Sequence, residues 1–197
     1  MSPVTWVLLV VALLVVFWAI GAFNRLTRLK NAIANAFGQI DVQLKRRYDL
    51  IPNLVEVARK YLAHESQTLE AVIAARNQAK SAEQTAAASP LNAGAIGALA
   101  GAEQLLGGAL GRLMAVAEAY PELKADQTMR ELSEELASTE NRIGFARQAY
   151  NDHVLAFNDA AAQFPTLIIA RLFNFQTQSM LASTTSEVER QPVKVSF

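Results

Sequence analysis

An uninterrupted apolar run near the N-terminus constrains this chain more than any other feature of its sequence. Residues 4–23 carry no charge, and every one of them except Thr5 is apolar or small. As a helix this run would be about 30 Å long, which matches the hydrocarbon core of a bilayer. Trp6 lies near one end and Trp18 toward the other, and amphipathic aromatic rings favour membrane interfaces. The run therefore predicts one N-terminal transmembrane helix.

The charges that flank this run predict its orientation. Arg25, Arg28 and Lys30 follow it directly, whereas residues 1–3 contain no Lys or Arg. Basic flanks are retained on the cytoplasmic side, so we expect the N-terminus outside and the following domain in the cytoplasm. A cleaved signal peptide is the competing interpretation, because residues 19–21 have small-x-small spacing. That interpretation needs a basic segment before the apolar run, which this sequence lacks.

Beyond the run, apolar residues recur every three or four positions, as in amphipathic helices. The first such stripe comprises Leu26, Leu29, Ile33, Phe37, Ile40, Leu44, Ile51, Val55, Ala58 and Leu62. Pro52 lies within it and removes one backbone donor, which predicts a kink near Leu50. No strand-like alternation is present in the sequence.

Further helices are predicted over residues 66–82, 102–119 and 167–175, and from an N-cap at Asp126 to Phe164. The segment 85–101 is rich in Ala, Ser and Gly and contains Pro90, which predicts a loop. The fold class is thus all-α: a transmembrane helix followed by an antiparallel up-and-down bundle of about four long helices.

Three regions are expected: an anchor (1–24), a helical bundle domain (25–175) and a C-terminal tail (176–197). Residues 25–47 hold six basic residues and one acid, whereas residues 118–159 hold nine acids and four basic residues. These opposite charges predict that the first and last long helices are neighbours. Glycines four positions apart, at 97/101 and 107/111, predict close helix packing.

The sequence offers little for catalysis. The chain has no cysteine, which excludes disulfides and thiolate chemistry, and its 18 basic and 18 acidic residues do not favour nucleic acid. A di-iron bundle requires Glu-x-x-His, yet Tyr61 and Tyr150 precede His64 and His153 by three positions. We therefore predict no enzyme, no metal and no cofactor.

Long motifs in the chain resemble the LemA family of bacterial membrane proteins. They are Gln-Ile-Asp-Val-Gln-Leu-Lys-Arg-Arg-Tyr-Asp-Leu-Ile-Pro-Asn-Leu-Val-Glu at residues 39–56 and shorter blocks at 63–65, 74–76, 118–124, 140–143, 146–151, 164–165 and 194–197. The resemblance implies an anchor in the bacterial inner (cell) membrane and a long-helix bundle without catalytic residues. It also implies a link to envelope stress and membrane proteases, or to membrane organisation.

The motifs are rich in polar residues, which suits either a buried network that sets helix register or a surface for a partner. These residues are Asp41, Gln43, Arg46, Arg47, Asp49, Asn53, Arg142 and Asn151. The leading hypothesis is a scaffold or adaptor at the lipid bilayer, acting as a coiled-coil-like homo-oligomer or binding a membrane partner such as a membrane protease. The alternative is a sensor that binds a small ligand or lipid headgroup through the basic flank Arg25, Arg28 and Lys30. An enzyme is the third hypothesis, and it lacks any nucleophile–base or metal constellation in this sequence.

Overall fold

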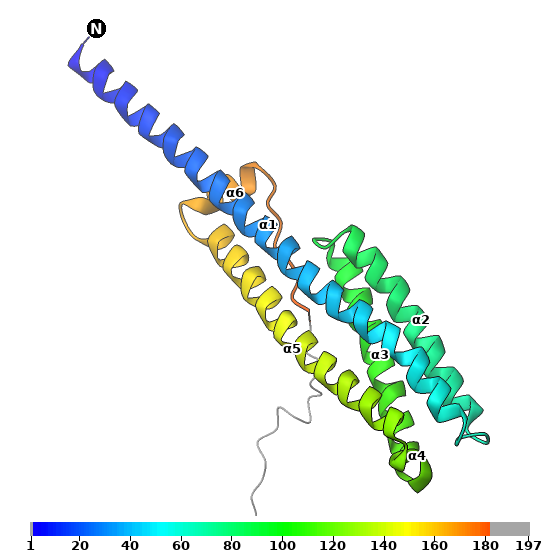
Figure 1. The fold of residues 1–197 in the computed structure, drawn as a ribbon. Coiled ribbons are helices and arrows are strands. Elements are labelled where there is room, and N and C mark those ends of the chain that lie inside the picture. Colours follow the sequence, from blue (N-terminus) through cyan, green and yellow to red (C-terminus); the bar gives the residue numbers. More distant parts are fainter. Residues whose placement is uncertain (1, 182–197) are drawn as a thin grey trace, which may run out of the picture.

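The computed structural model describes residues 2–181, and this part of the chain is built from helices without a strand. The helices are α1 (Pro3–Arg59), α2 (Ser66–Ala88), α3 (Ala93–Glu118), α4 (Pro121–Ala125), α5 (Gln127–Ala162) and α6 (Thr166–Leu172). Four of them are long, and they form the bundle in Figure 1. The predicted all-α fold is confirmed.

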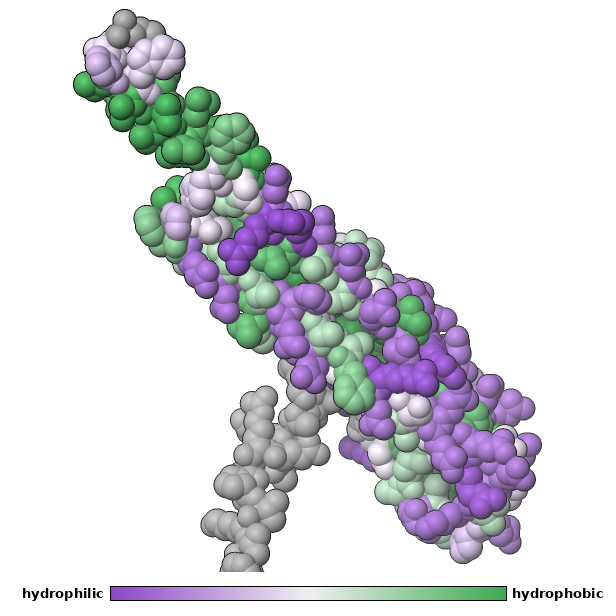
Figure 2. Space-filling view, turned by 60° about the vertical axis from the view of Figure 1, so that its left-hand side comes forward, coloured by the Kyte–Doolittle hydropathy of each residue, from purple (hydrophilic) through white to green (hydrophobic). Residues whose placement is uncertain are grey.

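Helix α1 is 57 residues long, and its two parts differ in how far their apolar side chains are exposed. Its first third projects beyond the other helices (Figure 1), and its apolar side chains there are exposed. From Leu26 onward its apolar stripe is buried in the bundle. Within the described part of the chain, α1 is the one helix long and apolar enough to cross a membrane. Figure 2 shows the projecting part as a hydrophobic rod and most of the visible bundle surface as hydrophilic.

The bundle is organised around the buried part of α1. Helix α5 runs antiparallel along it, and the α2–α3 hairpin packs beside it (Figure 1). The aromatic rings of Phe37 and Tyr150 meet edge-on, with centroids 6.2 Å apart, and join α1 to α5. Tyr48, Tyr150 and Phe157 are the largest fully buried side chains. Burying each apolar side chain of this kind stabilises the fold by about 1.5–3 kcal/mol, so the core, rather than surface charge, holds the bundle together.

The loop predicted over residues 85–101 is wrong. Helix α2 continues to Ala88, and α3 begins at Ala93, so only residues 89–92 connect them. Asn92 caps α3, because its side-chain oxygen accepts a hydrogen bond from the Ala95 amide at 3.0 Å. Alanine has the highest helix propensity, and the buried side chains of Ile96 and Leu99 dock this stretch on the core. Core contacts therefore outweigh the cost of the glycines.

The prediction of close packing at the spaced glycines is also wrong. A Cβ atom added at Gly97, Gly101, Gly107 or Gly111 would meet no heavy atom within 4 Å. These glycines are exposed on α3. Within the described part of the chain they bring no two helices together.

The start of α5 follows the prediction. The Asp126 side chain accepts a hydrogen bond from the Met129 amide at 2.9 Å, and the Tyr61 hydroxyl donates to it at 2.9 Å. These hydrogen bonds, the backbone one first, lower the pKa of Asp126. The cap therefore stays charged at neutral pH, where it complements the positive end of the α5 dipole.

A side chain from α2 repairs the backbone defect at Pro52. Proline has no amide hydrogen, so the carbonyl of Tyr48 loses its helical donor. The Arg76 guanidinium donates to this carbonyl at 3.0 Å. Helix α1 continues through Pro52 to Arg59, and the proline becomes a point at which α2 is attached.

Candidate functional site

Charged side chains from three helices meet inside the bundle around Glu103 of α3. Its carboxylate accepts hydrogen bonds from Arg47 Nη1 at 2.7 Å and from the Tyr48 hydroxyl at 2.6 Å. Arg147 Nη2 lies 3.7 Å from the same carboxylate, and Arg47 also pairs with Glu140 of α5 at 3.0 Å. Burial, together with the negative charge of Glu103, raises the pKa of Tyr48, so Tyr48 remains a neutral donor. We call these five residues the Glu103 cluster.

The Glu103 cluster links three helices, and its members Arg47 and Glu140 also line a hollow of about 400 Å³ between α3 and α5. It contains two cations and two anions, which balance, and Glu103 is almost completely buried. A buried charge is tolerated when it is paired and hydrogen-bonded. These contacts connect α1 to α3 and α5. No group of residues suited to hold a metal ion is present in residues 2–181.

A second buried acid, Glu83 of α2, faces Asp41 and Lys45 of α1. Lys45 Nζ lies 2.7 Å from Asp41 Oδ2 and 3.7 Å from Glu83 Oε1. Burial, followed by the hydrogen bond with Asp41 and the Asp41 charge, raises the pKa of Glu83 to about 7. Burial also pushes the pKa of Asp41 upward, but hydrogen bonds with Glu83 and Lys45 outweigh it, and the net pKa is lowered.

The two carboxyl groups of this pair can share one proton. Asp41 Oδ1 and Glu83 Oε1 are buried, and neither has a hydrogen-bond donor among the described residues. Two carboxyl groups that share a site titrate as a pair, with one pKa raised. A proton on Glu83 satisfies both oxygens, because Glu83 then donates to Asp41.

The eight polar residues singled out from the sequence do not form one network in the described structure. Arg47 belongs to the Glu103 cluster and Asp41 to the carboxyl pair, whereas the Gln43 side-chain oxygen is buried without a hydrogen-bond partner among the described residues. Arg46 lies at the surface and pairs with Glu135 of α5 at 2.6 Å. The remaining exposed members are Asp49, Asn53 and Arg142. Whether any of them contacts a partner stays a prediction.

Asn151, and Asn158 two turns later on α5, form hydrogen bonds with the backbone of the segment that follows α6. The Asn151 side chain bonds both the amide and the carbonyl of Leu181, at 2.9 and 3.0 Å. Asn158 bonds the amide and carbonyl of Gln178 in the same way, at 2.8 and 2.9 Å. The chain after α6 therefore runs antiparallel along α5. The predicted tail, residues 176–197, is held there over its first residues, and the rest of it lies outside the described part.

Four charged residues with contacts in the bundle were not predicted from the sequence, although the spacing of apolar residues points to three of them: Glu83, Glu103 and Arg76, but not Arg147. On α3 the buried positions follow alternating steps of three and four, and Glu103 occupies one of them between Leu99 and Leu106. On α2 the same spacing places Arg76 and Glu83 on the stripe that contains Leu69, Val72, Ala79 and Ala86. A charged residue that replaces an apolar one in such a stripe points to a buried polar contact.

The end of the bundle from which the apolar rod projects carries the predicted basic flank. Arg25 and Arg28 are exposed, and the Lys30 ammonium lies 5.9 Å from the centre of the Phe175 ring. Beside the flank is an apolar hollow of about 330 Å³, lined by α1 residues and by Phe173, which follows α6. Phe23 of α1 contacts Phe173 edge-on, with centroids 4.9 Å apart.

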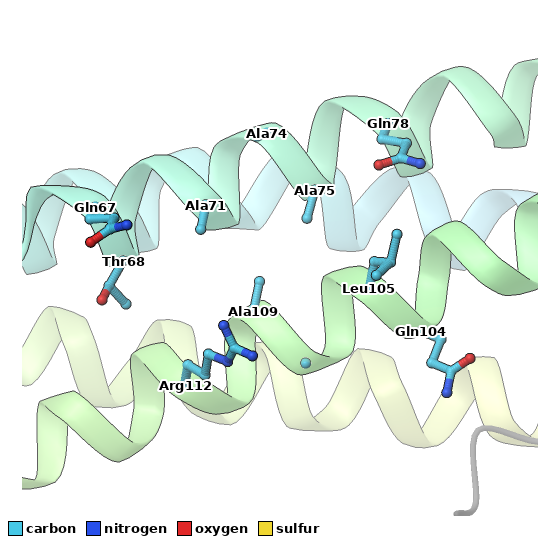
Figure 3. A pocket seen from close by; sticks show the side chains of 11 residues that line it. Gln67, Thr68, Ala71, Ala74, Ala75, Gln78, Gln104, Leu105, Ala109 and Arg112 are labelled. Carbon is cyan, nitrogen blue, oxygen red and sulfur yellow. The ribbon is translucent and has the colours of Figure 1, made fainter.

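A larger groove of about 710 Å³ lies between α2 and α3. Figure 3 shows Thr68, Ala71 and Ala75 of α2 facing it from one side and Ala109 and Arg112 of α3 from the other. Small side chains leave this groove shallow and open. It has no cluster of acid–base or nucleophilic groups among its lining residues.

A bundle whose central helix extends as an exposed apolar rod defines the class of a helical protein with a candidate membrane anchor. The model of the LemA family matches residues 36–197, and the chain belongs to the LemA family. Magnetosome protein MamQ of Magnetospirillum gryphiswaldense is 28% identical over 151 residues, 69% of this chain and 56% of MamQ. Magnetosome protein MamQ 1 of Paramagnetospirillum magneticum gives the same identity and coverage. The aligned part of the chain thus spans just over half the length of these relatives.

Proposed function

We propose that this protein is a membrane-anchored scaffold or adaptor, whose bundle binds a second copy of the chain or a membrane protein partner. Residues 4–23 of α1 span the bilayer, the N-terminus lies outside and the bundle lies in the cytoplasm. Arg25, Arg28 and Lys30 beyond the span support this orientation. A bacterial inner membrane is the location that the family resemblance favours.

The observation that carries this proposal is the continuity of α1. The same helix provides the exposed apolar rod and the central element of the core, with no break between them. A continuous helix acts as a semi-rigid spacer, so the bundle is held close to a set distance from the anchor. Rigid presentation is what a scaffold requires, whereas a flexible linker would suit a merely tethered domain.

The interior of the bundle also supports a structural role. The Glu103 cluster and the Asp41–Glu83 pair connect α1 to α2, α3 and α5, and their charged groups are directed at one another. Neither opens onto the α2–α3 groove. The relatives are named as magnetosome proteins.

Mass photometry of the full-length protein in mild detergent and in nanodiscs tests the scaffold proposal. We expect a discrete oligomer, or a cross-linked complex with a membrane protein such as a membrane protease. Leu105→Glu in the groove and Phe145→Glu on α5 introduce the same charge at two exposed sites, which are 57% and 74% accessible. Loss of assembly in one variant, with unchanged helicity, would assign the face. A monomer at every concentration, without cross-linked products in membranes, would contradict the proposal.

Membrane topology can be tested independently because the chain has no cysteine. Single-cysteine variants at Ser2 and at the exposed Arg142 would be treated with a membrane-impermeant maleimide in intact cells. We expect labelling at Ser2 alone. Labelling at residue 142 alone would show the opposite orientation, with the bundle outside, because Arg142 lies on the bundle.

A headgroup-binding sensor is the second candidate, and the exposure of Arg25 and Arg28 beside the anchor favours it. Native mass spectrometry of the full-length protein with added phosphatidylglycerol or phosphatidylcholine provides a direct test. Retention of phosphatidylglycerol that disappears in an Arg25→Gln/Arg28→Gln variant would support this candidate. Equal retention of both lipids would contradict it.

A further inference from the structure

Helix α6 presents an apolar face that no described residue covers. Ile168 and Leu172 are four apart on α6, so they lie on one side of the helix, and the exposed Phe164 immediately precedes it. Their exposed fractions are 81%, 54% and 73%, and that of Phe173 is 54%. The opposite side, which includes Ile169 and Ala170, is buried against the bundle. The exposed set, which we call the α6 face, is thus turned away from the core of the protein that carries it.

Helix α6 lies beside the part of α1 that leaves the bundle (Figure 1). Phe23 packs edge-on against Phe173 and Phe175, with centroid distances of 4.9 and 5.6 Å. Phe173 also lines the apolar hollow together with Val16, Ala19, Ile20 and Phe23 of α1. Aromatic packing therefore holds the end of α6 at a set height along the rod.

This height determines what surrounds α6. Residues 16–23 form the last part of the apolar run, about 12 Å of helix at 1.5 Å per residue. When residues 4–23 fill the hydrocarbon core, a side chain packed against Phe23, such as Phe173, lies at the boundary between acyl chains and headgroups. Water would have to be drawn into the bilayer to keep Phe173 and its neighbours hydrated.

We propose that the α6 face inserts into the leaflet from which α1 emerges, which gives the protein a second membrane contact. The inference rests on the proposed membrane anchor and adds a site to it. The occupant is a lipid surface, because the α6 face is continuous with the apolar rod through the shared hollow. Exposed Arg171 on α6 and Arg25 and Arg28 on α1 supply cations at the same end of the bundle. Apolar and aromatic side chains bordered by Arg are typical of interfacial helices.

A second membrane contact through α6 would restrict the rotation and tilt of the bundle relative to the bilayer. A single span can rotate about its own axis and tilt in the bilayer. A second apolar contact beside it fixes which side of the bundle faces the membrane, and thereby which side faces the cytoplasm. The α6 face would then orient the bundle for its partner.

Single-cysteine labelling of the full-length protein in vesicles of phosphatidylcholine and phosphatidylglycerol tests the proposal. An environment-sensitive fluorophore is placed at Ile168 or Leu172, and quenching by nitroxide-bearing lipids is measured. Phe145 on α5, which is 74% exposed, is the matched control for an exposed apolar site. Leu14 in the rod reports the anchor itself.

We expect blue-shifted emission and at least several-fold stronger lipid quenching at residues 168 and 172 than at residue 145, with residue 14 also quenched. If residue 14 is quenched and residues 168 and 172 behave like residue 145, the second contact is refuted while the anchor stands. If residue 14 is not quenched, the anchor fails as well. Blue-shifted emission at residues 168 and 172 without lipid quenching would indicate a protein occupant and would overturn the lipid assignment.

Discussion

The replacement Glu83→Gln should make the bundle more stable at alkaline pH and leave it almost unchanged at acidic pH. The Glu83 side chain is only 1% exposed, and its pKa is raised from 4.5 to about 7, mainly by burial and then by Asp41. The unfolded chain releases this proton near pH 4.5 while the folded chain retains it to about pH 7. The Glu83 contribution to folding is therefore complete below 4.5 and is lost as the pH rises through 7.

The magnitude follows from the size of the pKa change. One pKa unit corresponds to about 1.4 kcal/mol, so a raise from 4.5 to about 7 corresponds to about 3 kcal/mol. Glutamine has nearly the same shape, carries no charge and can still donate to Asp41. The variant should thus gain about 3 kcal/mol over the wild type well above pH 7 and about zero near pH 4.5.

Urea unfolding of the full-length protein in mild detergent, followed by far-UV circular dichroism, measures this difference. The free energy of unfolding would be determined for both proteins at several pH values between about 5 and 8.5. Glu135→Gln is the control, because it removes an exposed ion pair with Arg46 and should change stability by at most about 1 kcal/mol, without the same pH dependence. A Glu83→Gln effect that is constant across this range would refute a carboxyl pair that shares a proton.

Other positions test the remaining structural conclusions. Glu103→Ala leaves the buried Arg47 guanidinium without its 2.7 Å partner and should destabilise the bundle by about 3–5 kcal/mol in the same assay; a loss under about 1 kcal/mol would contradict the cluster's role. Arg76→Met removes the donor to the carbonyl one turn before the helix proline and should cost about 1–3 kcal/mol. Hydrogen exchange of the backbone amides around Tyr48 should also become faster. Unchanged exchange and stability would contradict a stabilising role for the Arg76 hydrogen bond. Gly108→Ala, where a Cβ meets nothing within 4 Å, should raise the melting temperature by stabilising α3 by about 0.5–1 kcal/mol. Gly94→Ala should raise the stability of α3 by less, because the new Cβ would lie 3.2 Å from Oδ1 of the capping Asn92. Equal stabilisation by the two substitutions would contradict this distinction.

Local sequence patterns determined the class of the fold. The apolar run, the three-and-four spacing and the N-cap at Asp126 depend on neighbours along the chain, and the structure shows a long α1, a helical bundle and the Asp126 cap. Opposite charges suggested that the first and last long helices are adjacent, and α5 indeed lies beside α1 with Arg46 paired to Glu135. Periodicity and capping act over a few residues, so they can be recognised without a tertiary structure.

Tertiary packing decided the rest. Residues 85–101 have the composition of a loop, yet Ile96 and Leu99 gain enough from burial to keep α3 helical from Ala93. Glu83 and Glu103 look like surface acids in sequence, and they become core residues only because α1 places Lys45 and Arg47 opposite them. The partner of a buried charge is set by how helices dock, over separations of tens of residues. Local propensity carries no information about such docking, because it depends on the packing of whole helix faces.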